Sequence, residues 1–372
     1  MNFPAPKTQP GVGHLGRWGR APLPLLEEGA ALGPVFRLQL WRPTVVGYSP
    51  DWNRFVLGDV RTFRSKGSMS GLSPYLGAGV VRTDEPDHRP RRRELNPHFT
   101  HRSVQDLRPC IADIAVRRLP LGPFDAVAWA AATVREILAA TFFGGLFPPR
   151  LLAQFLRPLD RALPAPLLRR PLLFYRMNRA LAHALAIAPS GTLGAALWEL
   201  PGGLEEARVA LSAGYDTTAH TLAWLLFHAA GHPRWCEPDM REAVIDEVLR
   251  LYPAGWLGSR RCAENTAFAG VTIAAGTLVL YSPYLTHRDP TLWKEPLSFQ
   301  PGRFADPLPP WGYIPFAAGE RTCLGRPLAR LILDSVLSAF AGSQLDHVQG
   351  DPRPRAAITL APAEPLLLRR KV

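Results

Sequence analysis

Residues 316–325 read Phe316-Ala317-Ala318-Gly319-Glu320-Arg321-Thr322-Cys323-Leu324-Gly325, directly before an amphipathic pattern over Arg326–Phe340 that predicts a helix. The cysteine of this loop therefore lies near a helix N-terminus, where exposed N–H groups and the helix dipole favour a thiolate. The two glycines allow the backbone to fold tightly around the sulfur, the arginine places a cation nearby, and the phenylalanine supplies an apolar cover. A sheltered thiolate of this kind is suited to ligating a soft or redox-active metal.

The loop has the form F-x-x-G-x-R-x-C-x-G, which resembles the heme-binding loop of the cytochrome P450 family. A lone cysteine is usually an ordinary buried residue, but a match at each of these fixed positions favours the heme interpretation. The resemblance implies that Cys323 is the metal ligand to the iron of heme b, iron protoporphyrin IX. It also implies that Phe316, Gly319, Arg321 and Gly325 bind this cofactor.

Two further motifs follow the order expected of that family. Glu247-Val248-Leu249-Arg250 lies in a helical pattern over Arg241–Leu251, which places its charged ends on one face, and it resembles the E-x-x-R of the K helix. Pro301-Gly302-Arg303-Phe304 resembles the P-x-R-F element. Spacing alone also fits a solvated surface ion pair. The resemblance implies instead that the glutamate and both arginines form a buried network that braces the cysteine loop.

The segment Ala213-Gly214-Tyr215-Asp216-Thr217-Thr218 lies within a helical pattern from about Leu204 to Ala230. Asp and Thr are poor formers of helix interiors, because their side chains compete for backbone groups, so the segment predicts a local opening of the helix. A kinked, solvated helix is the alternative interpretation of these residues. The segment resembles the A-G-x-[DE]-T-[TS] motif of the family's I helix. The resemblance implies that Asp216 and Thr217 are catalytic and deliver protons during dioxygen activation.

Three more basic residues match the family at single positions. His88 and Arg92 resemble the H-x-x-x-R at the start of the C helix, and Arg260 resembles the arginine that follows the K helix. The resemblance implies that these residues, with Arg321, donate hydrogen bonds to the two heme propionates, which need charged partners when partly buried. The neighbouring Arg261 leaves the register open, so either arginine is a candidate for that role.

Composition limits the remaining classes of function. The 372 residues are 47% hydrophobic and 20% charged, which suits a large core and excludes a disordered chain. The four cysteines form no CxxC pair, which argues against a disulfide framework or a structural zinc site. The net charge of +12 comes from arginines scattered along the chain, so we expect no nucleic-acid partner. Gly11–Gly16 fits G-x-G-x-x-G by letter, but no strand precedes it, which argues against dinucleotide binding.

The chain should be mainly α-helical with a small β portion, because strands and helices do not alternate. The resemblance implies the cytochrome P450 fold, a triangular helical prism with the heme between the I and L helices, and a single domain over 1–372. Residues 1–20 form a Pro/Gly-rich lead-in, and the segment 145–203 is short for a region that should hold the F, G and H helices.

The residue patterns predict the following elements. In the first part of the chain we expect strands at Val35–Leu40 and Thr44–Tyr48, a helix begun by Ser49-Pro50-Asp51, and a loop over 66–85. Helices follow over 88–250, with breaks near 120–123, 144–149, 164–171 and 189–203. Towards the C-terminus we expect strands at Ala267–Ile273 and Thr277–Ser282, a loop-rich stretch to about 325, and a β-like tail near Ala361–Leu368.

No transmembrane anchor is expected. The longest runs without charge, Ile137–Pro149 and Thr221–Pro233, are shorter than the ~18–20 apolar residues that span a bilayer. The N-terminal residues contain no apolar stretch of the kind that signal peptides carry. We therefore expect a soluble, cytoplasmic protein.

The resemblance implies an oxidoreductase, a monooxygenase that hydroxylates a small apolar substrate of the lipid, terpenoid or carotenoid type with O2. Segments 146–175, Pro253–Leu257 and Pro362–Leu366 are expected to form its apolar pocket. A peroxide-driven peroxygenase or hydroperoxide isomerase is an alternative, against which Asp216 and Thr217 speak. A non-catalytic heme-binding protein is another.

Two electrons must come from outside, since the chain has neither a flavin nor a nicotinamide fingerprint. An acidic ferredoxin or flavodoxin with its reductase is therefore the expected partner. Basic residues near the cysteine loop would form the docking face for electron transfer. These residues are Arg89, Arg91, Arg93, Arg326 and Arg330.

Overall fold

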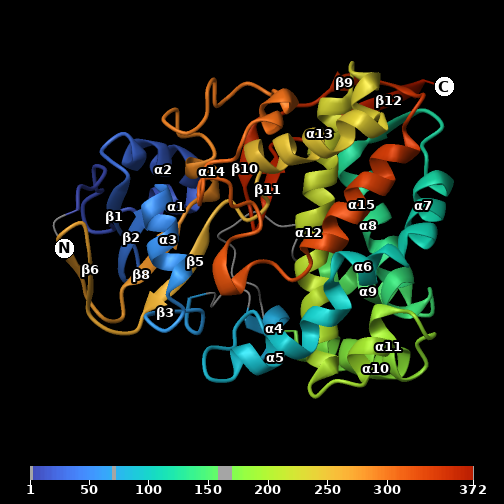
Figure 1. Ribbon diagram of the computed structural model, residues 1–372, viewed down its shortest axis with the longest axis horizontal. Helices are drawn as coiled ribbons and strands as arrows, with labels where there is room; N and C mark the ends of the chain where they lie inside the picture. The colour runs from blue at the N-terminus through green and yellow to red at the C-terminus, as the bar shows by residue number, and fades with distance from the viewer. Residues whose placement is uncertain (1–2, 69–72, 158–169, 372) are drawn as a thin grey trace.

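The computed structural model describes residues 3–68, 73–157 and 170–371. A β-rich part and a larger helical part lie side by side (Figure 1). The helices of the described residues are α1 (Leu15–Arg20), α2 (Pro22–Ala30), α3 (Pro50–Gly58), α4 (Ser73–Leu76), α5 (His88–Leu95), α6 (His101–Gln105), α7 (Arg108–Arg117), α8 (Ala126–Phe143), α9 (Pro149–Leu156), α10 (Pro171–Ala186), α11 (Leu193–Trp198), α12 (Gly203–Ala229), α13 (Pro238–Leu251), α14 (Pro283–Thr286) and α15 (Arg326–Ala339), with 3-10 turns at η2 (Asn96–Phe99), η4 (Pro233–Cys236), η5 (Pro301–Ala305) and η6 (Gly319–Arg321).

The strands form one larger sheet and three small ones. The larger sheet has the order β1-β2-β8-β5-β3, in which β2 and β8 are parallel and the other neighbours are antiparallel. The small sheets are β4-β12-β9 and the two hairpins β6-β7 and β10-β11. The strands are β1 (Val35–Gln39), β2 (Pro43–Gly47), β3 (Phe63–Arg64), β4 (Pro123–Asp125), β5 (Gly258–Cys262), β6 (Thr266–Phe268), β7 (Val271–Ile273), β8 (Leu278–Tyr281), β9 (Gln344–Gln349), β10 (Pro354–Ala356), β11 (Leu360–Pro362) and β12 (Leu367–Lys371).

Most predicted elements near the N-terminus are confirmed. Strands β1 and β2 match the predicted pair to within one residue at each end. Helix α3 begins after Ser49, whose side chain accepts a hydrogen bond from Trp52 N at 3.2 Å, as an N-cap does. Within the predicted loop over 66–85 the structure adds α4, and residues 69–72 of that loop lie outside the described residues.

One strand prediction was wrong in detail, and one strand was missed. The single strand predicted at Ala267–Ile273 is the hairpin β6-β7, because Ala269 and Gly270 have φ of 47° and 76° and turn the chain back on itself. Strand β4 falls at the predicted break near 120–123. It pairs with β12 at the far end of the chain, a contact that no local pattern predicts.

Helix α12 is the central element of the helical part, and it packs against α8, α15, α10 and α11 (Figure 1). The predicted opening at residues 213–218 was wrong, because the helix continues through them. The hydroxyl of Thr217 in this segment and that of Thr221 just after it bond back to the preceding turn: Thr217 Oγ1 donates to Ala213 O at 2.6 Å, and Thr221 Oγ1 donates to Thr217 O at 2.8 Å. These two hydroxyl groups are thus satisfied without breaking the helix.

The short region over 145–203 carries three helices, α9, α10 and α11, and residues 158–169 lie outside the described part. Just before it, α8 is long and apolar enough to cross a membrane by composition. However, 61% of that stretch is buried inside the protein, and α8 packs along α12 and α7. The apolar composition of α8 is accounted for by its place in the core.

A fully buried ion pair joins α13 to the loops beneath it. Arg250 donates from Nε to Glu247 Oε2 at 2.6 Å and from Nη2 to Oε1 at 2.8 Å, and Arg303 Nε reaches the same Oε1 at 3.1 Å. Further donors of Arg250 bind the carbonyl oxygens of His287, Pro296 and Ser298. The predicted network of two arginines and a glutamate is therefore present and buried.

The network reaches the cysteine loop through one histidine. His287 Nδ1 lies 3.1 Å from Arg250 O, and its Nε2 accepts a hydrogen bond from Ile314 N at 2.9 Å. Burial lowers the pKa of His287 to about 3, so the ring is neutral and can accept this bond. Since Ile314 lies two residues before the cysteine loop, the ion pair positions the start of that loop.

The substitution Arg250→Met should lower the free energy of unfolding by about 3–5 kcal/mol, because it leaves the Glu247 carboxylate buried without its main partner. Arg234→Met is the matched control: its ion pair with Asp239 is exposed and should contribute at most about 1 kcal/mol. Denaturant unfolding of both variants measures the difference. Equal losses in the two variants would contradict the assigned role of the network.

Candidate active site

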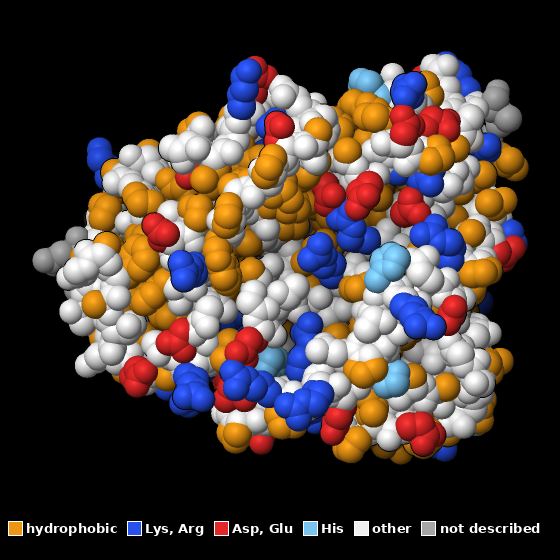
Figure 2. All heavy atoms as spheres, viewed as in Figure 1, with side chains coloured by type: hydrophobic (Ala, Val, Ile, Leu, Met, Phe, Trp, Pro, Cys, Tyr) orange, Lys and Arg blue, Asp and Glu red, His pale blue; other side chains and the backbone are white. Residues whose placement is uncertain are grey.

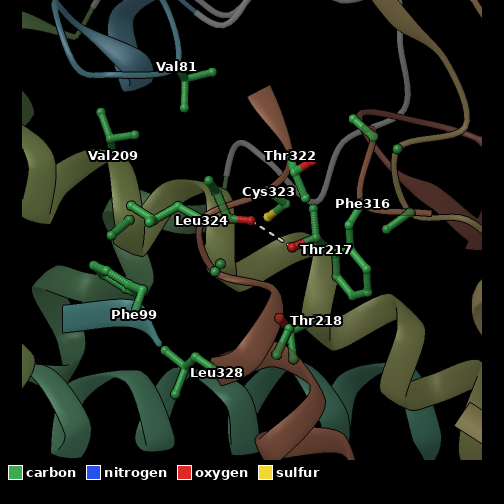
Figure 3. A pocket seen from close by; sticks show the side chains of 18 of the residues that line it. Val81, Phe99, Val209, Thr217, Thr218, Phe316, Thr322, Cys323, Leu324 and Leu328 are labelled. Atoms are coloured by element: carbon green, nitrogen blue, oxygen red, sulfur yellow. Dashed lines mark hydrogen bonds between the residues drawn. The ribbon is translucent and has the colours of Figure 1, made fainter. Parts of the chain in front are cut away.

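A cavity of about 410 Å³ lies between α12 and α15 and reaches the cysteine loop. Its size is within the ~300–1,000 Å³ range of ligand and cofactor sites. Figure 3 shows the sulfur of Cys323 and the hydroxyl of Thr217 in this pocket, with Val81, Val209 and Phe316 among the apolar side chains around them. The cavity thus brings together segments that are far apart in the sequence.

The cysteine loop is a closed turn. Cys323 N donates to Phe316 O at 2.9 Å, and Cys323 is an exposed residue that lines the cavity. Burial raises the pKa of the Cys323 thiol, whereas backbone hydrogen bonds from Gly325 and Arg326 and the charge of Arg92 lower it. The backbone donors are therefore already in place for a thiolate, and a metal cation would supply the missing positive charge.

The two glycines of the loop have different roles. Gly319 has φ of +69°, and a Cβ there would lie 2.6 Å from Leu57 O, so only glycine fits. Gly325 has an ordinary φ of −78° and lines the cavity, where a Cβ would project into open space. Gly319 thus shapes the loop, as predicted for tight folding, while Gly325 keeps the cavity open.

A cluster of cationic and hydrogen-bonding side chains lines one region of the cavity. The structure places all four predicted residues there: His88, Arg92, Arg260 and Arg321. Arg321 donates from Nη2 to Asp84 Oδ1 at 2.9 Å, but its buried Nε has no hydrogen-bond partner among the described residues. An unpartnered buried donor is costly, which indicates that a ligand completes this cluster.

The positive charges of this cluster also repel one another. Burial, followed by the charge of Arg260, lowers the pKa of Arg321, and burial, followed by the charge of Arg321, lowers the pKa of His88. Burial also lowers the pKa of Arg92. Cations that depress one another's pKa in a partly dry site are stabilised by an anionic ligand that sits among them.

The structure decides between the two adjacent arginines of β5. Arg260 is 4% exposed and lines the cavity, whereas Arg261 is exposed on the other face of the strand. Alternation along a strand sends neighbouring side chains to opposite faces, so only one of the pair can reach the cavity. Arg260 is the residue in position for an anion.

The acid and the alcohol of α12 face different surroundings. Thr217 lines the cavity, but the described cavity lining does not include Asp216, which is 2% exposed. The carboxylate accepts a hydrogen bond from Thr359 Oγ1 at 2.7 Å, and His220 Nδ1 lies 3.4 Å from its other oxygen. Burial raises the pKa of Asp216 to about 7, although the bond from Thr359 and the charge of Arg355 act in the opposite direction.

The comparisons with known proteins agree on one family. The cytochrome P450 family model matches residues 239–362. Cyclooctatin synthase from Streptomyces melanosporofaciens is 28% identical over 96% of this chain and 94% of its own. The crystal structure of a 6-coordinated cytochrome P450 from Thermus thermophilus has a TM-score of 0.82 at 28% identity, covering 94% of this chain and 98% of that one. The chain belongs to the cytochrome P450 family.

The retinoic acid-bound cyanobacterial CYP120A1, with a TM-score of 0.86 at 19% identity, adds support for the fold alone. Family membership makes this P450 a heme-thiolate monooxygenase that binds heme b, so the predicted fold, cofactor and enzyme class are confirmed. The residues of the cavity fit that group: a sulfur in one wall, open space over Gly325, and described donors without partners at Arg321 Nε and Ser65 Oγ.

Sequence reasoning missed a carboxylate in the cavity of this P450. Glu206 of α12 is 4% exposed, accepts hydrogen bonds from Val80 N at 2.9 and 3.2 Å, and pairs with Arg91 Nε at 3.3 Å. Burial raises the pKa of Glu206. The contact ties the loop before α5 to α12 over the cavity, and no motif in the sequence marks it.

The predicted pocket segments were correct only in part. Ala254, Gly255 and Leu257 line the cavity of this P450 as expected. Among the described residues, however, none of 146–157, 170–175 or 362–366 does so, and 158–169 lie outside the described part. The apolar side chains of α9 face the core instead, and Leu366 is fully buried in the same cluster.

Asp216→Asn should make the stability of this P450 less dependent on pH. The folded carboxyl keeps its proton up to about pH 7 while the unfolded one loses it above 3.8, so this group's contribution to stability falls as pH rises through that window. Between about pH 5 and pH 8 the variant should gain about 2–3 kcal/mol relative to the wild type.

Denaturant unfolding of the heme-loaded protein across that pH range measures the difference. Thr141→Val is the control: its hydroxyl is buried in α8 and bonds back to Ile137 O, and the change removes no titratable group. Its stability difference from the wild type should stay constant with pH. A constant difference for Asp216→Asn as well would contradict the raised pKa.

Proposed function

We propose that this P450 hydroxylates an apolar substrate of the lipid or terpenoid type, with Cys323 as the residue that would ligate the iron of heme b and with electrons from an acidic ferredoxin or flavodoxin and its reductase. The observation that carries the proposal is the Cys323 sulfur in a cavity where a cluster of basic side chains leaves the buried Nε of Arg321 without a hydrogen-bond partner among the described residues. When bound, the heme supplies the oxygen activation by which one atom of O2 enters the substrate.

The protein residues would hold the cofactor at both edges. The Gly325 and Arg326 N–H groups stabilise the negative sulfur, and Phe316 covers it from the side. At the other edge His88, Arg92, Arg260 and Arg321 would donate to the propionates, which gives the unpartnered Arg321 Nε an acceptor. Charge-assisted bonds of this kind fix the orientation of the cofactor as well as its affinity.

The lining supports an apolar substrate. Val80, Val81, Phe142, Leu197, Val209 and Ala210 line the cavity. Thr217 adds a hydroxyl among them, and Asp216 next to it holds a proton near neutral pH. We propose that these two residues supply protons to the reacting oxygen, and that the walls exclude bulk water. The relative named cyclooctatin synthase is consistent with an apolar ligand of the lipid or terpenoid type.

The first test is Cys323→Ser. The purified wild type should bind hemin and give, when reduced and exposed to carbon monoxide, the red-shifted Soret band of thiolate ligation, and the variant should lose that band. Cys110→Ser, at an exposed free cysteine of α7, should keep it. A colourless wild type, or an unchanged band in Cys323→Ser, would refute the proposal.

The proposed docking face is smaller than the sequence suggested. Arg89 pairs with Glu320 at 2.6 Å, Arg91 pairs with the buried Glu206, and Arg330 pairs with Asp246 and Glu242. Ion-paired arginines offer little charge to a partner, which leaves Arg93 and Arg326 as the exposed candidates. Figure 2 shows Lys and Arg side chains across the middle and lower part of the face on which α5 lies.

The double variant Arg93→Glu/Arg326→Glu should slow reduction by an acidic ferredoxin about tenfold or more at low salt and flatten the salt dependence of the rate. Stopped-flow reduction at several ionic strengths measures both effects. The carbon monoxide spectrum checks that the heme site is intact. Arg234→Glu, at a distant exposed ion pair, is the control and should change neither rate nor slope. An unchanged reduction rate in the double variant would contradict the proposed docking face.

The state of the cysteines is compatible with the proposed cytoplasmic location. All four lie in the described part of the chain and are free, and Cys236 and Cys262 are buried. Free buried thiols are the usual state in a reducing compartment.

A further inference from the structure

Three buried side chains meet behind the cavity wall, and none of them is among the described residues that line the cavity. Thr359 Oγ1 lies 2.7 Å from Asp216 Oδ2 and 2.6 Å from His220 Nδ1, and the latter lies 3.4 Å from Asp216 Oδ1. Asp216 and His220 are one turn apart on α12, so both point to the same side of the helix. Thr359 bridges them from a distant part of the chain.

The bridge has a definite polarity. A hydroxyl has one proton, and with the carboxylate ionised it must donate that proton to Asp216 Oδ2. The contact of 2.6 Å to His220 is then possible only if Nδ1 carries a proton and donates it to Thr359 Oγ1. The three groups therefore form a directed chain of donors from imidazole to hydroxyl to carboxylate.

Thr359 is held firmly in this position. It lies in the tight turn between β10 and β11, where Ala357 N donates to Thr359 O at 2.9 Å. The next residue anchors the turn to α12, because Leu360 O accepts from Trp224 Nε1 at 3.0 Å. On its other side Leu360 N donates to Ala254 O at 3.3 Å. These hydrogen bonds thus fix the position of the Thr359 hydroxyl against α12.

The proton-donating end of this chain, His220, is the most exposed of the three residues. Asp216 and Thr359 are each 2% exposed, while His220 is 7% exposed. Among the residues that the structure describes, the titratable groups that face Asp216 are His220 on its own helix and Arg355 from β10, whose charge acts on the carboxyl. Of these, only a histidine gains and loses protons near neutral pH.

We propose that Thr359 and His220 are positioning residues that reload Asp216 with the proton it delivers to the cavity. A proton moves from His220 Nδ1 to Thr359 Oγ1 as the hydroxyl proton of Thr359 moves to Asp216 Oδ2. Imidazolium and carboxylate become imidazole and carboxylic acid, the threonine is unchanged, and His220 recovers a proton from water. This inference rests on the proposed role of Asp216 in the monooxygenase reaction.

The test follows the protonation of Asp216 itself, so it needs no substrate. In the heme-loaded, reduced carbon monoxide form, the infrared C=O band that is lost in Asp216→Asn belongs to the protonated carboxyl. Thr359→Val removes the hydroxyl at nearly constant volume and should raise the midpoint pH of that band by about one unit, because the carboxylate loses its donor. Thr359→Ser should restore the wild-type midpoint, and Thr141→Val should not move it.

A second readout separates a relay from a merely structural contact. Two groups joined by a hydrogen-bond chain titrate as a pair, so the ¹⁵N signal of His220 Nδ1 should shift as Asp216 ionises in the wild type and in Thr359→Ser. In Thr359→Val that linked shift should disappear. If the midpoint and the linked shift persist in Thr359→Val, the inference is overturned.

The carbon monoxide spectrum distinguishes this failure from a failure of the proposed function. A normal thiolate band with an unmoved midpoint refutes only the relay. Loss of the thiolate band in the wild type refutes the proposed function, whatever the infrared result.

Discussion

The buried ion pair of Glu247 and Arg250 is the constraint on which the geometry of the site depends. Arg250 donates hydrogen bonds to one carboxylate and to three loop carbonyl oxygens. A single side chain therefore holds loops that have little regular structure. Through the neutral ring of His287 the same network reaches Ile314 and the start of the cysteine loop. A buried ion pair is weak evidence for stability in general, but here it gives a long loop one defined path.

The cavity that results is electrostatically incomplete by itself. Its apolar walls raise the pKa of the Cys323 thiol and lower the pKa of Arg321 and His88, so each group is strained in the direction that a dianionic, metal-containing cofactor relieves. Behind the cavity wall, where Asp216 faces Thr359, burial likewise raises the pKa of the carboxyl to about 7. Burial away from water thus shifts the pKa of groups on both sides of α12.

Much of the site could be predicted from the sequence, because its chemistry is concentrated in short motifs. The cysteine loop, the E-x-x-R pair and His88 to Arg92 are local patterns whose residues keep their relative positions on a turn or helix. The exposure of the proposed docking arginines could not be predicted locally, since Arg91 turns inward to Glu206. The opening predicted in α12 also failed, because hydroxyl groups that disfavour an isolated helix bond back to it when the helix is packed in a core.

The sequence by itself determined the periodicity of the long helices, the strand pair β1-β2 and the order of the motifs, since these depend on spacings of a few residues. Only the tertiary structure decided that Arg260 rather than Arg261 faces the cavity, and that Asp216 points to Thr359 and not into the cavity. It also decided that Glu206 bonds to a loop more than a hundred residues away in the sequence. These outcomes depend on which face of an element is covered by a remote part of the chain. Packing sets that face, and no local pattern of residues records it.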